Sequence, residues 1–254
     1  MGTYLGQNFL RDTSVLTRII EAGEIKKGET VLEIGPGEGV LTRALLDAGA
    51  NVLAVEKDAR LVKHLDSRYP SEIASGQLHL INDDILKLDI SSLFANCKLG
   101  ISSFKLISNI PYYITGEILR KFLTANAQPT LMVLLVQKEV AERIVDTKES
   151  ILSLSVKAYG TPSYICTVPR TAFDPEPKVD SAVLKIESIS RAFFEDSNMN
   201  EDEFFKLVRS GFAHKRKRLG NNIELPTRLR ERFGEARAEE LSLADWALIH
   251  NSSI

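Results

Sequence analysis

The chain has 254 residues, of which 44% are hydrophobic and 26% are charged, and its formal net charge is −2. These values are typical of a globular protein with one large domain, or with a large and a small one, and they argue against a generally basic nucleic-acid binder. No apolar run approaches the roughly 20 residues of a membrane span, and the N-terminus lacks the apolar core of a secretory signal, so we expect no membrane association.

Through the first two thirds of the chain, short apolar runs alternate with helical patterns. Strands are predicted at 30–35, 50–56, 77–81, 104–110 and 131–137, and helices at 40–49, 58–69, 116–125 and 138–146. This alternation predicts a mainly parallel sheet with helices on both faces. Two later β-rich runs, 163–170 and 181–189, have no helix between them, so we expect an antiparallel hairpin at one edge of the sheet.

Beyond about residue 190 the pattern is helical only, with predicted helices at 201–216, 226–234 and 237–251. Ser242 precedes the apolar run of the last helix, as an N-cap does. We therefore divide the chain into an α/β domain, residues 1–190, and a small all-helical domain, residues 191–254.

The segment from Phe204 to Ile223 contains no acidic residue. Its basic residues are Lys206, Arg209, Lys215, Arg216, Lys217 and Arg218. A local basic patch binds phosphate even when the whole chain is near neutral, although such a run is equally often a solvated helix face.

A glycine loop follows the first predicted strand. Gly35, Gly37 and Gly39 form the pattern E-x-G-x-G-x-G, which starts at Glu33, and a helix follows. Glycines there let a ligand approach the backbone at a helix N-terminus, and three alternating glycines exceed the needs of an ordinary turn. A dinucleotide fingerprint requires glycine at position 40, which is Val40. The pattern instead resembles the first motif of Rossmann-like methyltransferases, which bind S-adenosylmethionine.

Carboxylates follow the next two predicted strands. Glu56 ends the second, where a carboxylate accepts hydrogen bonds from ribose hydroxyls. Asp84 follows the third, where it would accept a bond from an adenine amine of the cofactor; Asp83 competes for this role unless it caps a helix. Glu56 would suit NAD equally well, so the glycine loop and this acid leave the chemistry open.

The run Asn109-Ile110-Pro111-Tyr112 lies at the C-terminal end of the fourth strand, the edge where open α/β sheets bind ligands. It matches the [DNS]-[ILP]-P-[FYW] motif of methyltransferases that act on planar amino groups. The lone pair of an adenine amine is delocalised, so acceptors at Asn109 and beside the donor-free Pro111 would favour the attacking nitrogen. Tyr112 offers a stacking face worth about 1–3 kcal/mol. A strand-ending turn with packed tyrosines is the alternative, and the glycine loop on the same edge disfavours it.

In order and spacing, these and further motifs resemble the KsgA/RsmA family of small-subunit rRNA adenine dimethyltransferases. The matching segments are 5–12, 32–42, 55–58, 82–86, 108–115, 134–144, 173–186 and 211–223. The resemblance implies a class I Rossmann-like methyltransferase with a small helical domain. It also implies S-adenosylmethionine-dependent dimethylation of two adjacent adenosines in a hairpin near the 3′ end of small-subunit rRNA, with S-adenosylhomocysteine as product, in small-subunit biogenesis.

The same resemblance implies roles for particular residues. Those expected to contact the cofactor are Gln7, Asn8, Leu10, Glu33, Gly35, Gly37, Gly39, Glu56, Asp84 and Asn109. Those expected at the target base are Asn109, Pro111, Tyr112 and Phe173, with Phe173 sandwiching the base against Tyr112 unless it anchors the Pro-rich turn in the core. Those expected to contact rRNA phosphates are Lys215, Arg216, Lys217 and Arg218. Tyr113 either lines the pocket or packs behind Tyr112.

Alternative functions remain open at this point. They are an Erm-type enzyme that acts on large-subunit rRNA and confers macrolide resistance, a non-catalytic assembly or transcription factor on the same fold, and a nicotinamide-dependent dehydrogenase. The expected partner is rRNA in the immature small subunit, and the expected state is a monomer. The two cysteines, Cys97 and Cys166, have no metal-type spacing, so we expect no metal and free thiols in a cytoplasmic protein, or an organellar one if a transit peptide was removed.

Overall fold

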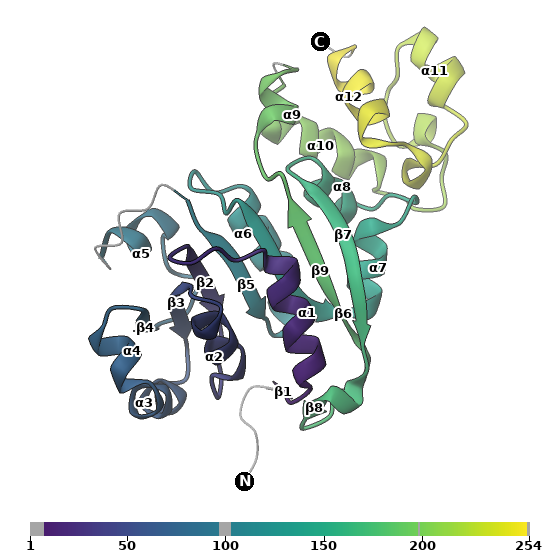
Figure 1. Ribbon diagram of the computed structural model, residues 1–254. Helices are drawn as coiled ribbons and strands as arrows, with labels where there is room; N and C mark the ends of the chain where they lie inside the picture. Colours follow the sequence, from purple (N-terminus) through teal and green to yellow (C-terminus); the bar gives the residue numbers. More distant parts are fainter. Residues whose placement is uncertain (1–7, 97–102, 198, 253–254) are drawn as a thin grey trace. The chain divides into compact units, whose positions relative to one another are not determined.

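The computed structural model describes residues 8–96, 103–197 and 199–252 (Figure 1). The chain divides into two compact units, Met1–Ala141 with Ser163–Ile189 and Glu142–Pro162 with Ser190–Ile254. The sequence analysis divided the chain at residue 190. The structure differs from this division because residues 142–162 group with the C-terminal helices. The reason is that α8 (Ile151–Lys157) packs against α10 (Glu201–Gly211).

The first unit is built on a seven-stranded sheet of order β4-β3-β2-β5-β6-β9-β7. Its strands are β2 (Thr30–Ile34), β3 (Asn51–Glu56), β4 (Leu78–Asn82), β5 (Lys105–Asn109), β6 (Leu131–Gln137), β7 (Thr161–Val168) and β9 (Ser181–Glu187). Strands β2 to β6 pair in parallel, and β9 pairs antiparallel with β6. The mainly parallel sheet with late β-rich strands at one edge is therefore confirmed.

Helices cover this sheet, and the strand order fixes their sides. The chain moves from β2 to β3 in one direction and from β5 to β6 in the other. Because such crossovers are right-handed, α2 (Val40–Asp47) and α6 (Thr115–Leu123) lie on opposite faces. The order reverses between β2 and β5, and the open crevice of an α/β sheet forms at such a reversal. Other helices of this unit are α3 (Ala59–Arg68), α4 (Pro70–Ala74) and α5 (Ile90–Asn96), while α7 (Lys138–Val145) begins in this unit and ends in the second.

Two N-terminal elements were not predicted from the sequence. Helix α1 (Thr13–Gly23), capped by the Asp12 carboxylate, lies across β5, β6 and β9 on the face of α2 (Figure 1). Strand β1 (Phe9–Leu10) pairs antiparallel with β8 (Phe173–Asp174), so that Leu10 lies opposite Phe173. The short two-stranded sheet thus joins the N-terminal motif to the Pro-rich segment more than 160 residues later in the chain.

The second unit is helical apart from its connections. Its helices are α8, α9 (Ala192–Glu195), α10, α11 (Thr227–Phe233) and α12 (Leu243–Asn251). Ser242 caps α12 as predicted, because its hydroxyl accepts from the Asp245 N–H at 3.2 Å. The helix predicted at 201–216 is too long: α10 ends at Gly211, where the Trp246 ring occupies the space of a side chain. In the part of the chain that the structure describes, no helix has the length and apolar composition of a membrane span.

Candidate active site

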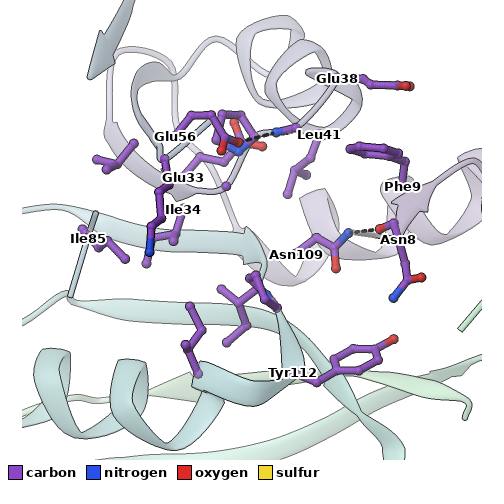
Figure 2. Close-up of a pocket in the computed structure, with 18 of the residues that line it drawn as sticks. Asn8, Phe9, Glu33, Ile34, Glu38, Leu41, Glu56, Ile85, Asn109 and Tyr112 are labelled. Carbon is purple, nitrogen blue, oxygen red and sulfur yellow. Dashed lines mark hydrogen bonds between the residues drawn. The ribbon is translucent and has the colours of Figure 1, made fainter. Parts of the chain in front are cut away.

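A cavity lies at the carboxyl ends of β2, β3, β4 and β5, where the strand order reverses (Figure 2). Its ionisable lining is mostly acidic, with a single lysine among the carboxylates: Glu33, Glu38, Glu56, Asp83, Asp84 and Lys57. A lining of this kind suits a ligand with cationic groups, hydroxyls and amines. It disfavours the pyrophosphate of a dinucleotide, because like charges repel.

The glycine loop forms one wall of the cavity. Gly35, Gly37 and Gly39 all have left-handed backbones, with φ of 63°, 59° and 84°. A Cβ at Gly35 would meet no atom within 4 Å, so this backbone is open to a ligand. At Gly37 a Cβ would lie 2.8 Å from the Phe9 ring. The first two glycines therefore border the cavity, and their contact with the cofactor stays a prediction.

Gly39 has a different role from the predicted cofactor contact. It does not line the cavity, and a Cβ there would lie 2.7 Å from Leu65 and 2.8 Å from the Tyr69 ring. The Tyr69 hydroxyl donates to the Gly39 carbonyl at 2.7 Å. The third glycine thus lets α3 and the segment after it pack tightly against the start of α2.

Two buried carboxylates form the floor of the cavity. Glu56 is 4% exposed and accepts from the N–H of Gly37 at 3.2 Å and of Asp58 at 2.8 Å. Burial raises the pKa of Glu56 despite these bonds. Glu33 is 1% exposed. Among the residues that the structure describes, the only hydrogen-bond donor to its carboxyl group is the Thr42 hydroxyl, at 2.7 Å. Burial, together with the nearby charge of Glu56, raises the pKa of Glu33 to about 8. Glu33 therefore favours its protonated form more strongly than an exposed glutamate does.

Asp84 and Asp83, which the sequence left as competitors for one cofactor contact, both line the cavity but have different partners. The Oδ2 of Asp84 pairs with Lys57 Nζ at 2.9 Å, and its Oδ1 accepts from the Leu86 N–H at 3.1 Å. The bond from Lys57 lowers the pKa of Asp84, which keeps the carboxylate ionised. Asp83 is exposed, and its carboxylate accepts from the Asp84 N–H at 2.6 Å. Asp83 therefore orients Asp84, although both residues line the cavity.

Asn109, the last residue of β5, has a fixed orientation in the cavity. Its Nδ2 donates to the Asn8 carbonyl at 3.2 Å. No protein donor to its Oδ1 is found among the described residues, so this oxygen is available to a ligand. Figure 2 shows Asn109 between the carboxylates Glu33 and Glu56 on one side and Tyr112 on the other. Asn8 and Leu10 line the cavity as expected, whereas Gln7 lies outside the described residues.

The aromatic part of the motif follows directly. Pro111 precedes the short helix η1 (Tyr112–Ile114) and, like both tyrosines, lines the cavity. The Tyr112 hydroxyl lies 2.6 Å from Ser181 Oγ, and burial raises the pKa of Tyr112. Tyr113 is 69% exposed. It therefore lies on the rim of the cavity and does not pack behind Tyr112.

Phe173 is not placed as a second aromatic at the base site. It is 5% exposed, lies opposite Leu10 in the β1–β8 pair, and belongs to a buried cluster that includes Val168. It does not line the cavity. The pairing of β1 with β8 turns the ring into the core, which is the alternative that the sequence left open.

The predicted basic residues lie in the second unit, on exposed turns after α10. Arg218 forms an ion pair with Glu235. In the described ranges, no carboxylate pairs with Lys215, Arg216 or Lys217. Three of the four predicted cations are thus available for an anionic partner.

Several other lining residues were not assigned a role from the sequence. Among them are Phe9, Glu38, Lys57 and Ile85. Lys57 and Ile85 each follow an acidic residue predicted at the end of a strand. This position in the sequence could have identified them as lining residues. Glu38 is held by Arg11 at 2.6 Å, a contact that no local pattern indicates. Among the described residues, no three His, Cys, Asp or Glu side chains are grouped as metal ligands.

Comparisons with known proteins place the chain in a family. The model of the family described as ribosomal RNA adenine dimethylase matches residues 2–253. The ribosomal RNA small subunit methyltransferase A of Dehalococcoides mccartyi is 40% identical over 259 residues, which cover 96% of this chain and 86% of that protein. The protein of the same name from Streptococcus thermophilus is 36% identical over 265 residues, covering 97% and 90%.

Two solved structures are similar along nearly the whole chain. A dimethyladenosine transferase from Plasmodium falciparum has a TM-score of 0.76 and 27% identity, with 94% of each chain covered. The 23S rRNA methyltransferase ErmE has a TM-score of 0.75 and 25% identity, with 96% of this chain and 98% of that chain covered. Both structures are similar over the second unit as well as the first.

Proposed function

Because the chain belongs to the ribosomal RNA adenine dimethylase family, we propose that it dimethylates two adjacent adenosines near the 3′ end of small-subunit rRNA. The methyl donor is S-adenosylmethionine and the product is S-adenosylhomocysteine. The observation that carries this proposal is the fixed amide of Asn109, whose free oxygen lies between the acidic floor and Tyr112.

The acidic half of the cavity fits the methyl donor. S-adenosylmethionine, when bound, supplies an electrophilic methyl group on a sulfonium ion. Glu56, oriented by two backbone amides, is placed to accept from ribose hydroxyls, and Asp84 is placed to accept from the adenine amine. The open backbone at Gly35 allows close approach, which a side chain would prevent. Protonation of Glu33 limits the negative charge buried beneath the ligand.

The other half of the cavity fits a target adenine. The Asn109 oxygen and a backbone carbonyl beside Pro111 accept from the exocyclic amine, which favours a nitrogen lone pair directed at the methyl group. Tyr112 offers its ring for stacking, and the bond to Ser181 fixes that ring against β9. Positioning and electrostatics thus account for the transfer without a strong general base.

The exposed cations of the second unit suit the RNA backbone. Lys215, Arg216 and Lys217 offer sequence-independent phosphate contacts. We place the protein in the cytoplasm as a monomer that acts on rRNA in the immature small subunit. Specificity for the hairpin then comes from the shape of the RNA.

Methylation of large-subunit rRNA is a second candidate, because ErmE is similar over 98% of its chain. The curated relatives, which are more similar in sequence, carry the small-subunit name. The test is incubation with labelled S-adenosylmethionine and either immature small subunits or large-subunit rRNA, followed by mapping of labelled adenosines by mass spectrometry. We expect dimethyladenosine at two adjacent positions in the small subunit. Label in large-subunit rRNA alone would overturn the proposal, and cofactor binding without label would favour a non-catalytic factor.

A further inference from the structure

A second pocket lies in the first unit. It is formed by the end of β6, the start of α7, the turn η2 (Arg170–Ala172) and the segment that leads into β9. Its charged lining residues are Lys138, Glu139, Arg170, Lys178 and Asp180. Its lining residues other than Arg170 lie in the matching segments 134–144 and 173–186, but the methyl-transfer site described above gives them no role.

Ser181 lines neither pocket but contacts or adjoins lining residues of both. Ser181, the first residue of β9, lies opposite Gln137 in the β6–β9 pair, and its hydroxyl is 2.6 Å from that of Tyr112. Gln137 and Asp180, which precedes Ser181, both line the second pocket. Tyr112, the proposed stacking face, is therefore linked through one residue to two lining residues of the second pocket.

Asp180 holds the segments of the second pocket together. Its carbonyl accepts from the Lys138 N–H at 3.0 Å, and its carboxylate accepts from the Arg170 N–H at 3.0 Å. These bonds tie β6, η2 and the start of β9 to one another. The pocket is thus formed before any ligand binds, and its charged groups have defined positions.

The lining combines opposite charges with one apolar surface. Arg170 Nε pairs with Glu176 at 2.7 Å, whereas no carboxylate pairs with Lys178 within the described residues. Val179, beside Lys178, is 40% exposed. Cations are partners for phosphate, carboxylates accept from hydroxyls, and an exposed aliphatic side chain contacts a base. A bare anion would satisfy only the first of these groups, whereas a ribonucleotide satisfies all three.

We propose that this pocket binds a nucleotide that flanks the target adenosine in the substrate RNA. Lys178 and Arg170 contact its phosphate, and Glu139 accepts from its 2′-hydroxyl, the group that distinguishes RNA from DNA. The inference rests on the proposed rRNA methylation and adds a subsite to it. The pocket acts in RNA binding, so it does not affect the affinity for S-adenosylmethionine.

Lys178→Gln tests the phosphate contact, and Lys63→Gln on α3 is the matched control, because Lys63 is exposed in the same unit and lines neither pocket. We measure binding of the 254-residue chain, loaded with S-adenosylhomocysteine, to a hairpin RNA that contains the adenosines mapped by labelling. Lys178→Gln is expected to weaken RNA binding several-fold and to reduce the slope of log K against log salt by about 0.7–1. The control is expected to change neither, and the cofactor affinity of both variants is expected to equal that of the wild type.

Glu139→Ala, which removes the acceptor, tests the hydroxyl contact. RNAs with a single 2′-deoxy nucleotide on the 5′ or the 3′ side of the target are compared on wild type and variant. One of the two deoxy substitutions is expected to weaken wild-type binding several-fold and to have no further effect on Glu139→Ala.

Unchanged RNA affinity and salt slope for Lys178→Gln, or equal losses for Lys63→Gln, would overturn the inference while wild-type methylation stands. Equal effects of the deoxy substitutions on both proteins would remove Glu139 from the subsite. A wild type that methylates neither rRNA would instead overturn the proposed function, so the two failures are distinguishable.

Discussion

At the scale of single residues, the orientation of one amide decides what the site can do. Asn109 donates to the Asn8 carbonyl, so its oxygen remains the group presented to a ligand. A reversed amide would present a donor to the adenine amine, which is itself a donor. The backbone at Asn8 therefore sets the chemistry of the side chain at the end of β5.

Asn109→Ala should separate catalysis from cofactor binding. Loss of the acceptor is expected to reduce kcat by about 10²- to 10³-fold, the usual effect of removing one group that stabilises a transition state. The dissociation constant for S-adenosylmethionine, measured by calorimetry, is expected to change much less. An equal collapse of cofactor binding would contradict this division of roles.

Asn109→Asp is the matched variant. It keeps an acceptor oxygen but loses the donor to Asn8, so it is expected to retain more activity than the alanine variant. Single-turnover methylation of the mapped RNA measures both variants. An aspartate variant as inactive as the alanine variant would show that the bond to Asn8 is as necessary as the acceptor.

Residues at strand ends were predictable because the carboxyl edge of a parallel sheet collects them. Glu56, Asp84 and Asn109 all lie where their strands predict. Phe173 was not predictable in this way, because its ring direction depends on pairing with Leu10, far away in the chain. The position of Tyr113 on the rim likewise required the geometry of η1.

At the scale of elements, the glycines of the loop have two different structural roles. Its first two glycines border the cavity, and its third allows a helix contact. All three are glycines with a left-handed backbone, so neither the sequence nor the backbone angle distinguishes them. Only the atoms around each glycine do. The sequence therefore predicted the loop but not the separate role of Gly39.

Gly39→Ala should destabilise the fold by more than its backbone cost. Gly76→Ala is the control, because Gly76 has φ of 76° and open space around its Cβ. Both changes incur about 1–2 kcal/mol for a left-handed alanine, and crowding against Leu65 and Tyr69 adds about 1–3 kcal/mol at position 39. Urea unfolding measures the free energy of unfolding for each variant. If both variants lose the same free energy of unfolding and only Gly39→Ala lowers the affinity for the cofactor, Gly39 is a cofactor contact, as the sequence predicted.

The exposed turns after α10 should act through their unpaired cations. Substitution of Lys215, Arg216 and Lys217 together by Gln removes up to three phosphate contacts. The slope of log K against log salt for binding to immature small subunits is expected to fall by about 2–3. Arg218→Gln is expected to change the slope less, because Arg218 pairs with Glu235. A single Arg218→Gln change with an effect as large as that of the triple variant would contradict this assignment.

At the scale of the whole molecule, each unit has a separate source of stability. The first buries its strands between two helical layers, and the second packs aromatic side chains, among them Tyr159, Phe194 and Phe204. Sequence periodicity predicted both classes of structure. It did not place residues 142–162 with the second unit, because the packing of α8 on α10 is a tertiary contact.

The buried Glu33 should make global stability depend on pH. Its pKa is raised from 4.5 to about 8 by burial, so the folded state keeps a proton that the unfolded state has released between these values. The stabilisation is complete below the unfolded pKa and is lost as pH rises toward 8, by up to about 1.4 kcal/mol for each pH unit. Glu33→Gln, which stays neutral, should lack this decline. Urea unfolding of both proteins at pH 5, 6, 7 and 8 measures the difference.

The difference in the free energy of unfolding between wild type and Glu33→Gln reports on Glu33 alone. Glu56, whose pKa is also raised by burial, is present in both proteins. Glu21→Gln, on the exposed side of α1, controls for the loss of one carboxylate. A difference that stays constant from pH 5 to 8 would mean that Glu33 has the same protonation in the folded and unfolded chains. The floor of the cavity would then carry two buried negative charges close together at neutral pH, and only a cationic ligand would compensate them. Stability would in that case rise steeply on addition of S-adenosylmethionine, and the same titration would show it.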